Sequence, residues 1–368
     1  MNEVSSETAG LFASEVNRRS VLKGGLAGAG ALLFGGTLLS ACGSGDSAGD
    51  GKKIVVADWG GAIQDAEKKH LYAPFTKETG IEVVITDPPN DVKIKSQVDS
   101  GNVEWDLIAG GFSSVYALGR KYFEDLPQNI LNTSGIAKEF IDPQAIAYYL
   151  FSVNAGWNTD KLGGKKMESW ADFFDTKQFS GRRSLQAMSS AMDLEAALLA
   201  DGVPVKDVYP MDIDRAFRKL EELKPKVPQW WESGSQPGQM LVSGQVSASS
   251  IWSGRVFTLQ EEGAPIDFTW NQGYFQPAAW IVPKGAKNKD AAFQLIEYSL
   301  QPEVQARLWG SYPCGPTNEK AFDSLPEEYA KKLPTYPANA AVQFSRDEKW
   351  WAANREEVIK KWNKFKTS

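Results

Sequence analysis

Hydrophobic and polar positions alternate with two different periods in the first part of the folded region. Residues 53–57 form a short apolar run that is typical of a buried strand, and apolar positions at helical spacing follow over 63–79. The pattern then predicts a strand over 81–86, a helix over 92–100 and a strand over 106–109. Strands that alternate with helices in this way indicate an α/β fold with a parallel sheet.

Two later apolar stretches, residues 145–154 and 272–282, predict strands that cross between two halves of the molecule. A second α/β unit is expected between them. The chain closes with a predicted amphipathic helix over 347–366. The second α/β unit comprises residues 169–174, residues 177–185 and a helical stretch over 212–223, and a further helix is expected over 290–300. The apolar face of the last helix predicts core contacts rather than a recognition surface, through Trp350, Val358, Trp362 and Phe365.

The loops that follow the first and third predicted strands are candidates for a binding site. In such sheets, ligands bind at the carboxyl ends of the strands, so residues 58–61 and 110–114 should lie side by side. Glycines there let a ligand approach the backbone, although ordinary turn chemistry is the simpler interpretation of the Gly60 pair. Ser113 and Ser114 could cap the following helix and offer amides to an anion. The candidates from these loops are Trp59, Gly60, Gly111, Phe112 and Ser113.

The start of the chain predicts an export signal. Arg18 and Arg19 precede an apolar, glycine-rich run over 24–39, which is too short to span a bilayer comfortably and suits a twin-arginine signal. A buried helix is disfavoured, because each glycine in a helix interior costs about 1 kcal/mol relative to alanine.

The apolar run ends in residues 39–43, Leu-Ser-Ala-Cys-Gly, which resemble the lipobox of bacterial lipoproteins. In a lipobox the cysteine, here Cys42, is acylated and becomes the first mature residue. We therefore expect a signal peptide over 1–41 and a flexible tether over 42–52. The protein should be exported and held by its lipid at the outer face of the cell membrane or in the periplasm.

Length, charge and single residue types exclude several functions. The mature chain is too long for one ordinary core and predicts two domains of about 150 residues each. A net charge of −6 argues against nucleic acid as a partner. Only Cys314 remains after cleavage, so no intramolecular disulfide is possible, and the single His70 has no second histidine for a metal site or catalytic relay.

Two classes of protein can be tested against the residues of the chain. A glycan hydrolase would need two carboxylates across a cleft, but no phrase in the chain marks such a pair, a Gly-x-Ser-x-Gly elbow or a cysteine–histidine pairing. A ferric-ion receptor could use the oxygens of Tyr148 and Tyr149. Because these tyrosines lie in an apolar crossing strand, packing is the better interpretation.

Several phrases together resemble the bacterial spermidine/putrescine-binding family of ABC-importer solute receptors. They extend from about residue 53 to 325, and their order and spacing matter more than any one of them. The phrases are residues 57–61, 78–81, 230–239, 251–255, 282–288 and 312–318.

This resemblance implies a two-lobed, hinged periplasmic-binding-protein fold of the type II kind, with crossover strands. Lobe 1 would comprise 53–150 and 275–306, and lobe 2 would comprise 151–274 and 307–368. The lobes would close on a small-molecule solute, which a permease and an ATPase then import. The resemblance implies a monomer without cofactor or bound metal, and no enzymatic activity.

The aromatic part of the family's polyamine site is present in this chain. Trp59, Trp252 and Tyr312 match aromatic positions of the family, and such rings stack on alkyl chains and attract cations. The acidic part is absent: Ser189 and Gln276 stand in the regions where polyamine receptors carry acids, unless the alignment slips and places Asp193 there. Tyr274, in the same crossing as Gln276, completes the candidates from this region.

Arg255 points to a different ligand. It follows the cleft tryptophan in the phrase Trp-Ser-Gly-Arg, and a guanidinium there could bind a carboxylate through two parallel hydrogen bonds. Related receptors for 4-aminobutyrate resemble this arrangement, and Asp58 could then meet an amine or cap a helix. We therefore expect a carboxylate-bearing solute, either an amino acid of the 4-aminobutyrate type or an organic acid. A polyamine is the alternative, and an exported glycan-active enzyme is a more distant one.

Overall fold

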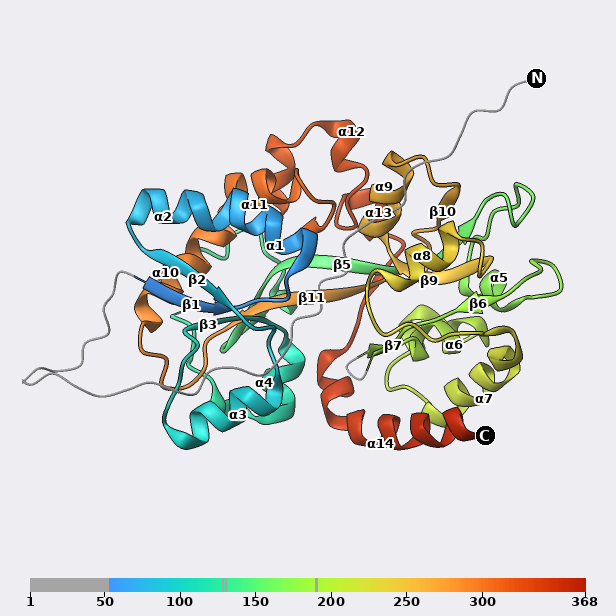
Figure 1. Ribbon diagram of the computed structural model, residues 1–368, viewed down its shortest axis with the longest axis horizontal. Coiled ribbons are helices and arrows are strands. Elements are labelled where there is room, and N and C mark those ends of the chain that lie inside the picture. The colour runs from blue at the N-terminus through green and yellow to red at the C-terminus, as the bar shows by residue number, and fades with distance from the viewer. Residues whose placement is uncertain (1–52, 128, 130, 189–190) are drawn as a thin grey trace, which may run out of the picture. The chain divides into compact units, whose positions relative to one another are not determined.

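The computed structural model describes residues 53–368 except 128, 130, 189 and 190 (Figure 1). The expected signal peptide, the tether, Cys42 and Ser189 therefore lie outside the described residues. Within the described part, no helix combines the length and the apolar character needed to cross a membrane.

The first three strands form the parallel sheet that the pattern predicts. β1 (Lys53–Ala57) lies between β2 (Glu82–Thr86) and β3 (Leu107–Gly110) and runs parallel to both. One continuous helical stretch joins β1 to β2, and α3 (Asp91–Ser100) leads toward β3. That stretch consists of α1 (Gly61–Glu67), a π-helical turn η1 (Lys68–Tyr72) and α2 (Ala73–Thr79).

Two long strands run from one group of elements to the other through the middle of Figure 1. β5 (Ala145–Asn158) and β11 (Tyr274–Ile281) are antiparallel neighbours, and they confirm the two predicted crossings. β11 also pairs with β3 in the antiparallel sense, because the chain returns along β11 toward the lobe that it left along β5. The main path of the sheet is β2-β1-β3-β11-β5-β9-β6, so the sheet is mixed rather than wholly parallel.

The second group of elements is built around β9 (Ala248–Trp252), which pairs with β5, and β6 (Arg183–Ser184). Six further short strands join the sheet or form a separate hairpin. The hairpin is β7 (Ala187–Met188) with β8 (Ala191–Met192); β4 (Ile141–Asp142), β10 (Ile266–Phe268) and β12 (Gly315–Pro316) pair with β5, and β13 (Phe344–Ser345) pairs with β11. The remaining α-helices are α4 (Phe112–Leu118), α5 (Trp170–Phe174), α6 (Leu194–Ala200), α7 (Ile213–Leu223), α8 (Gln236–Val242), α9 (Ser253–Glu261), α10 (Lys289–Leu300), α11 (Pro302–Trp309), α12 (Glu327–Ala330), α13 (Pro337–Ala340) and α14 (Glu348–Thr367).

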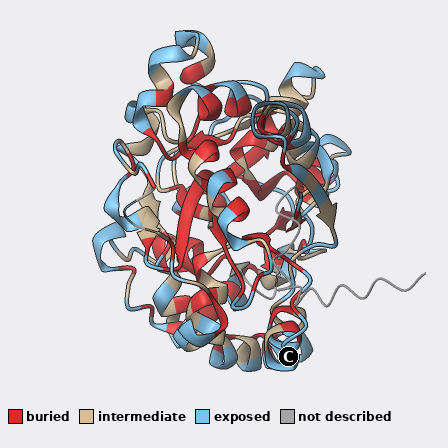
Figure 2. Ribbon diagram, turned by 90° about the vertical axis from the view of Figure 1, so that its left-hand side faces the viewer, coloured by how far each residue is buried: buried red, intermediate tan, exposed pale blue. Residues whose placement is uncertain are grey.

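Separate hydrophobic clusters make this a two-lobed fold. Figure 2 shows the buried residues concentrated along the strands, with exposed faces on the outer helices. On β5, Tyr149 packs in the cluster of the first lobe and Val153 packs in that of the second. On β11, Ala278 packs in the cluster of the first lobe and Tyr274 packs in that of the second. The two crossing strands thus pass from one core to the other within a few residues, as hinge strands must.

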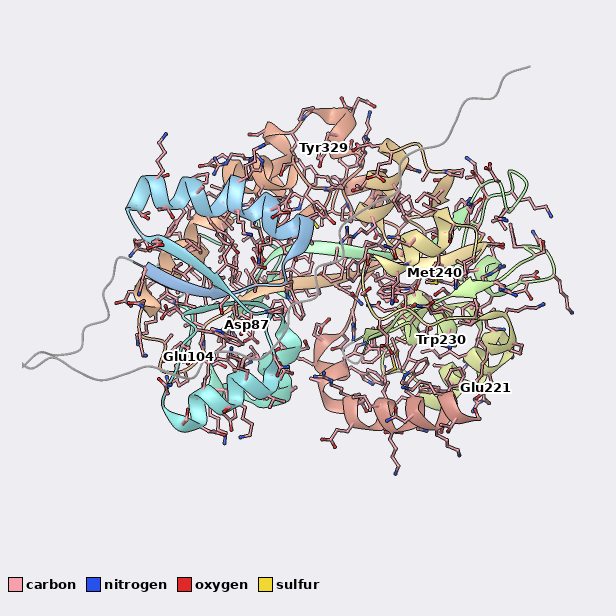
Figure 3. The ribbon with its side chains drawn as sticks, viewed as in Figure 1. Asp87, Glu104, Glu221, Trp230, Met240 and Tyr329 are labelled. Atoms are coloured by element: carbon pink, nitrogen blue, oxygen red, sulfur yellow. The ribbon has the colours of Figure 1, made fainter. Side chains whose placement is uncertain are left out.

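The segment after residue 307 packs differently from the expected division. Leu308 and Trp309 belong to the cluster of the first lobe, where the Trp309 indole Nε1 donates to the Tyr148 carbonyl oxygen over 3.2 Å. Tyr329, labelled in Figure 3, donates from its hydroxyl to the Trp309 carbonyl oxygen. We therefore propose that the first lobe continues past residue 307 at least as far as Tyr329.

The last helix is a core element of the second lobe, as predicted. Val358, Trp362 and Phe365 of α14 are buried in its cluster, and Trp350 packs against the cluster while half-buried. Trp351, which the pattern analysis did not single out, is also buried there.

Candidate functional site

The loop after β1 holds a large aromatic side chain in the open. Trp59 is 56 % exposed, although a tryptophan is normally well covered. Gly60 and Gly61 follow with φ angles of 79° and 72°, a conformation that favours glycine. A Cβ atom at either glycine would meet nothing within 4 Å. The exposed indole therefore stands at the edge of open space at the carboxyl end of β1.

The loop after β3 differs from expectation. Gly111 is the N-cap of α4, so Ser113 and Ser114 lie within the helix and do not cap it. The Ser114 hydroxyl instead donates to Asp91 Oδ1 over 2.7 Å. The prediction that these serines cap α4 is wrong, because the turn from β3 is shorter than the pattern suggested. Phe112 is buried, and Ser113 is half-buried.

The junction between β9 and α9 gathers aromatic rings in the second lobe. Trp252 ends β9 and is the N-cap of α9. Its ring centroid lies 5.0 Å from that of Phe151 and 5.7 Å from that of Trp231. A Cβ atom at Gly234 would lie 2.2 Å from the Trp252 ring, so only glycine fits against its face. Trp252 is therefore held in one position and remains half-buried.

Three polar atoms at this junction are buried without a hydrogen-bond partner among the described residues. They are the Trp252 indole Nε1, the Ser253 hydroxyl and the Arg255 Nε. Buried polar groups in native proteins are nearly always hydrogen-bonded. Three unpaired donors on neighbouring residues therefore require an explanation. All three can donate, and they belong to the N-cap and first turn of α9, where the amides at the helix N-terminus also favour an anion. The junction can thus accept an anionic group.

The start of α9 meets the segment that precedes β12. A Cβ atom at Gly254 would lie 2.8 Å from the Pro313 carbonyl oxygen, so the two backbones are in close approach. Burial and the neighbouring Cys314 raise the pKa of Tyr312 to about 12, while the positive charge of Arg255 acts in the opposite direction. Arg255 of the second lobe and Tyr312, which packs with the first, therefore lie near one another.

Tyr274 serves a buried network behind the junction. It is 1 % exposed, and its hydroxyl donates to Asp193 Oδ1 over 2.5 Å. Asp193 Oδ2 accepts from the backbone N–H of Gln186. Burial raises the pKa of Asp193 to about 6. Gln276 is also buried, on β11 opposite Phe151. The Asp193 carboxyl and the Tyr274 hydroxyl are thus already hydrogen-bonded to one another.

Two hollows on the surface do not coincide with the candidate residues. One, of about 300 Å³, lies between α4 and α14 and is lined by Tyr116, Arg120 and Lys349 among others. The other, of about 400 Å³, is lined by residues that include His70 and Arg307. No residue predicted from the sequence as part of the site lines either hollow.

The two tyrosines considered as ferric ligands have other roles. Tyr148 is 1 % exposed, stacks on Trp280 with ring centroids 4.0 Å apart, and donates its hydroxyl to Glu67. Tyr149 is buried against Trp309. Among residues 53–368 as described, no three or more histidine, cysteine or acidic side chains are grouped as metal ligands would be. Packing, as expected, accounts for both tyrosines.

The family model for bacterial extracellular solute-binding proteins matches residues 70–341. The chain belongs to this family. The gamma-aminobutyric acid-binding protein of Pseudomonas aeruginosa is 32% identical over 320 residues, which cover 85% of this chain and 90% of that protein. The spermidine/putrescine-binding periplasmic protein of Escherichia coli is 28% identical over 286 residues, covering 73% of this chain and 79% of that protein.

Solved structures agree with the fold of this solute-binding protein. An ABC transporter substrate-binding protein from Bradyrhizobium japonicum superimposes with a TM-score of 0.80 and is 35% identical. The match covers 85% of this chain and 99% of that one. The predicted family and two-lobed fold are thus confirmed, and the protein is a receptor rather than an enzyme. It binds a small solute outside the cytoplasm and works with the permease and ATPase of an ABC transporter.

Two residues of this solute-binding protein escaped the sequence analysis. Ser253 lies inside the phrase that identified Trp252 and Arg255, so its hydroxyl could have been noticed. Glu67 occupies a helical position on the same face as Ile63 and Leu71, and it is fully buried. An acid on an apolar helix face is a signal that a search for hydrophobic period alone discards.

Proposed function

We propose that this solute-binding protein is a lipid-anchored, monomeric receptor for a small carboxylate-bearing solute. The favoured solute is an amino acid of the 4-aminobutyrate type, with an organic acid as the next choice. The similarity to a gamma-aminobutyric acid-binding protein supports this choice. The observation that carries it is the group of unpaired donors on Trp252, Ser253 and Arg255.

The chemistry of this group favours a carboxylate over a cation. A carboxylate has two oxygens with several lone pairs, so it can accept from the guanidinium, the hydroxyl and an α9 amide together. An ammonium group offers only donors and would leave all three protein donors unpaired. Trp59 and Tyr312 would contribute rings that contact the rest of the solute.

Binding would act through the hinge. A solute that contacts Arg255 and also side chains of the first lobe gains its full interaction energy only when the lobes are closed. The solute therefore shifts the population toward the closed form, which the permease recognises. We place the hinge in β5 and β11, where neighbouring residues belong to different cores.

A polyamine remains the second candidate, because polyamine-binding relatives match most of the chain and the aromatic positions are present. A thermal-shift screen of the mature protein decides between the two. The screen compares 4-aminobutyrate, malate, common amino acids, putrescine and spermidine. A ligand at 100 times its Kd adds about 2.7 kcal/mol to the free energy of unfolding, which moves the midpoint visibly.

The outcomes of the screen are distinct. Stabilisation by carboxylate-bearing compounds alone supports the proposal. Stabilisation by putrescine or spermidine alone would overturn it and assign the receptor to polyamines.

The lipid anchor is proposed from Cys42 and its surroundings. The twin-arginine signal before it would direct export, and acylation of Cys42 would hold the receptor at the membrane. The tether predicted over 42–52 would then let the folded lobes reach the permease.

Replacing Cys42 with serine should release the receptor from membranes, because serine lacks the thiol that receives the lipid. Cell fractionation and immunoblotting measure the shift from the membrane to the soluble fraction. The matched control is Cys314→Ser, which changes a buried thiol outside the predicted signal and should leave the receptor in the membrane fraction. A Cys42→Ser protein that fractionates like wild type would refute the anchor.

A further inference from the structure

The loop that precedes α8 meets Trp252 at a point where no side chain fits. A Cβ atom at Gly234 would lie 2.2 Å from Cζ3 of the Trp252 indole and 2.9 Å from both Cε3 and Cη2. Real Cβ atoms essentially never come so close to another heavy atom. The indole is also rigid, so it cannot bend away as the tip of an aliphatic side chain can. A side chain at residue 234 would therefore displace the whole indole.

The backbone of Gly234 gives no other reason for glycine at this position. Gly234 is not among the described glycines that have a positive φ, so its φ lies in the range that other residues adopt. The residue is half-buried and belongs to none of the hydrophobic clusters. The close contact with Trp252 is thus what requires a residue without a side chain.

A side-chain amide holds this loop in place against Trp252. Gln236 Oε1 accepts from the backbone N–H groups of Glu232 and Ser233, over 2.7 and 3.2 Å. The Gln236 backbone N–H in turn donates to the Ser233 carbonyl oxygen over 3.1 Å. These bonds close the loop around Gly234. The loop cannot move away from Trp252 without breaking them.

Two further rings limit where the indole of Trp252 can go. The ring of Trp231 lies at 90° to it, and the ring of Phe151 lies at 56° to it. Trp231 is itself fixed, because it is fully buried and its indole Nε1 donates to the Ser250 carbonyl oxygen over 3.0 Å. An indole pushed from residue 234 can therefore not slide away, and it must rotate about its own side-chain bonds.

The end of the indole that meets Gly234 lies opposite its nitrogen. Cζ3 belongs to the six-membered ring, whereas Nε1 belongs to the five-membered ring. Rotation of the indole therefore moves Nε1, which is one of the three buried donors without a partner among the described residues. The other two donors, on Ser253 and Arg255, are carried by α9 and would not move with the indole.

We propose that Gly234 is a positioning residue for solute binding, because it lets Trp252 direct its indole N–H at the carboxylate that Ser253 and Arg255 also bind. This inference rests on the proposed function and deepens it. The indole then recognises the solute through a hydrogen bond, in addition to any ring contact. Residue 234 is therefore a specificity-determining position, since a side chain there removes one donor from the carboxylate.

Gly234→Ala should weaken the binding of 4-aminobutyrate at least about 10-fold, because a hydrogen bond to a charged group is lost. Calorimetric titration of the mature protein measures the change. The matched control is Gly238→Ala, four residues further on in α8. The new Cβ there meets the end of the flexible Leu259 side chain, 2.6 Å from Cδ1. Because that side chain can turn away, the control should keep its affinity within about 3-fold of wild type.

A double variant separates positioning from a general effect on the loop. Trp252→Phe removes Nε1 and shortens the side chain, so that it no longer reaches residue 234. It should weaken binding by a similar factor, about 10-fold. Gly234→Ala added to Trp252→Phe should then cost less than about 2-fold, since no indole is left to displace. If Gly234→Ala alone is too unstable to measure, adding Trp252→Phe should restore its thermal midpoint.

The position of the indole also has a readout that needs no solute. Isotope labelling of the 13 tryptophans gives one indole N–H signal for each in a two-dimensional NMR spectrum. The signal that Trp252→Phe removes belongs to Trp252. Gly234→Ala should shift this signal in the protein without solute, and Gly238→Ala should leave it in place. In wild type, 4-aminobutyrate should move the signal downfield, because the N–H gains a hydrogen bond to a carboxylate.

The possible failures are distinguishable. Additive effects of Gly234→Ala and Trp252→Phe on affinity overturn the role of Gly234. A Trp252 signal that Gly234→Ala leaves in place, or a thermal midpoint that Trp252→Phe does not restore, overturns it as well. These outcomes leave the proposed function standing. If wild type binds neither 4-aminobutyrate nor malate, the proposed function is overturned together with this inference.

Discussion

Replacing Arg255 with alanine is expected to weaken the binding of 4-aminobutyrate by about 2–5 kcal/mol, or roughly 30-fold or more. The loss is large because Arg255 Nε is buried without a hydrogen-bond partner among the described residues, so this donor is free to pair with the carboxylate of a solute. Removing it leaves the carboxylate of the solute in the closed cleft without a counter-charge. Calorimetric titration of the purified mature protein measures the change in Kd.

Arg182→Ala is the matched control for this variant. It makes the same substitution in the same lobe, but at an exposed residue, and should leave the Kd unchanged. Equal affinities of Arg255→Ala and wild type for 4-aminobutyrate would remove the argument for a carboxylate. A thermal midpoint close to that of wild type in the absence of ligand would show that Arg255→Ala is folded.

Replacing Trp280 with alanine should destabilise the receptor by about 3–5 kcal/mol. Trp280 is fully buried on β11, stacks on Tyr148, and donates from its indole Nε1 to the Ser299 hydroxyl over 2.9 Å. Alanine would leave a cavity between the sheet and α10 and would also leave the Ser299 hydroxyl without its donor. Denaturant titration without ligand measures the loss.

Trp59→Ala is the matched comparison, because it truncates the same side chain at an exposed site. We expect its stability to change by no more than about 0.5 kcal/mol, while its affinity for the solute falls by about 0.5–2 kcal/mol. The two variants thus distinguish a tryptophan that stabilises the fold from one that contributes to solute binding. A large loss of stability in Trp59→Ala, or none in Trp280→Ala, would contradict the burial on which both predictions rest.

Much of the fold could be predicted from local pattern. β1 occupies the predicted residues 53–57, and β5 and β11 occupy the two predicted crossings. These elements could be predicted because a strand that is covered on both faces needs a short apolar run. Such a run is visible in the sequence without knowledge of the strands that pair with it. The prediction that the serines after β3 cap α4 was wrong. A shift of two residues at the start of a helix does not alter the hydrophobic period, so the pattern does not locate the N-cap.

The candidate site was predictable only in part. Trp59, Trp252 and Arg255 could be selected because they stand in recognisable phrases at element ends. Tyr274 was selected in the same way, yet its hydroxyl is committed to Asp193. Residue type and position do not reveal whether a polar group already has a partner, since that depends on which distant side chain packs against it.

The sequence by itself determined the order of the main strands and helices and the family. It also supplied a short set of candidate residues and the prediction of an export signal before Cys42. These follow from periodicity, composition and phrases that are local in the chain. The tertiary structure decided which core the segment after residue 307 joins, and that the Tyr148 hydroxyl donates to the buried Glu67. It also decided that three donors at the junction of β9 and α9 have no partner among the described residues. Such facts depend on contacts between segments far apart in the chain, which form only when both lobes are packed.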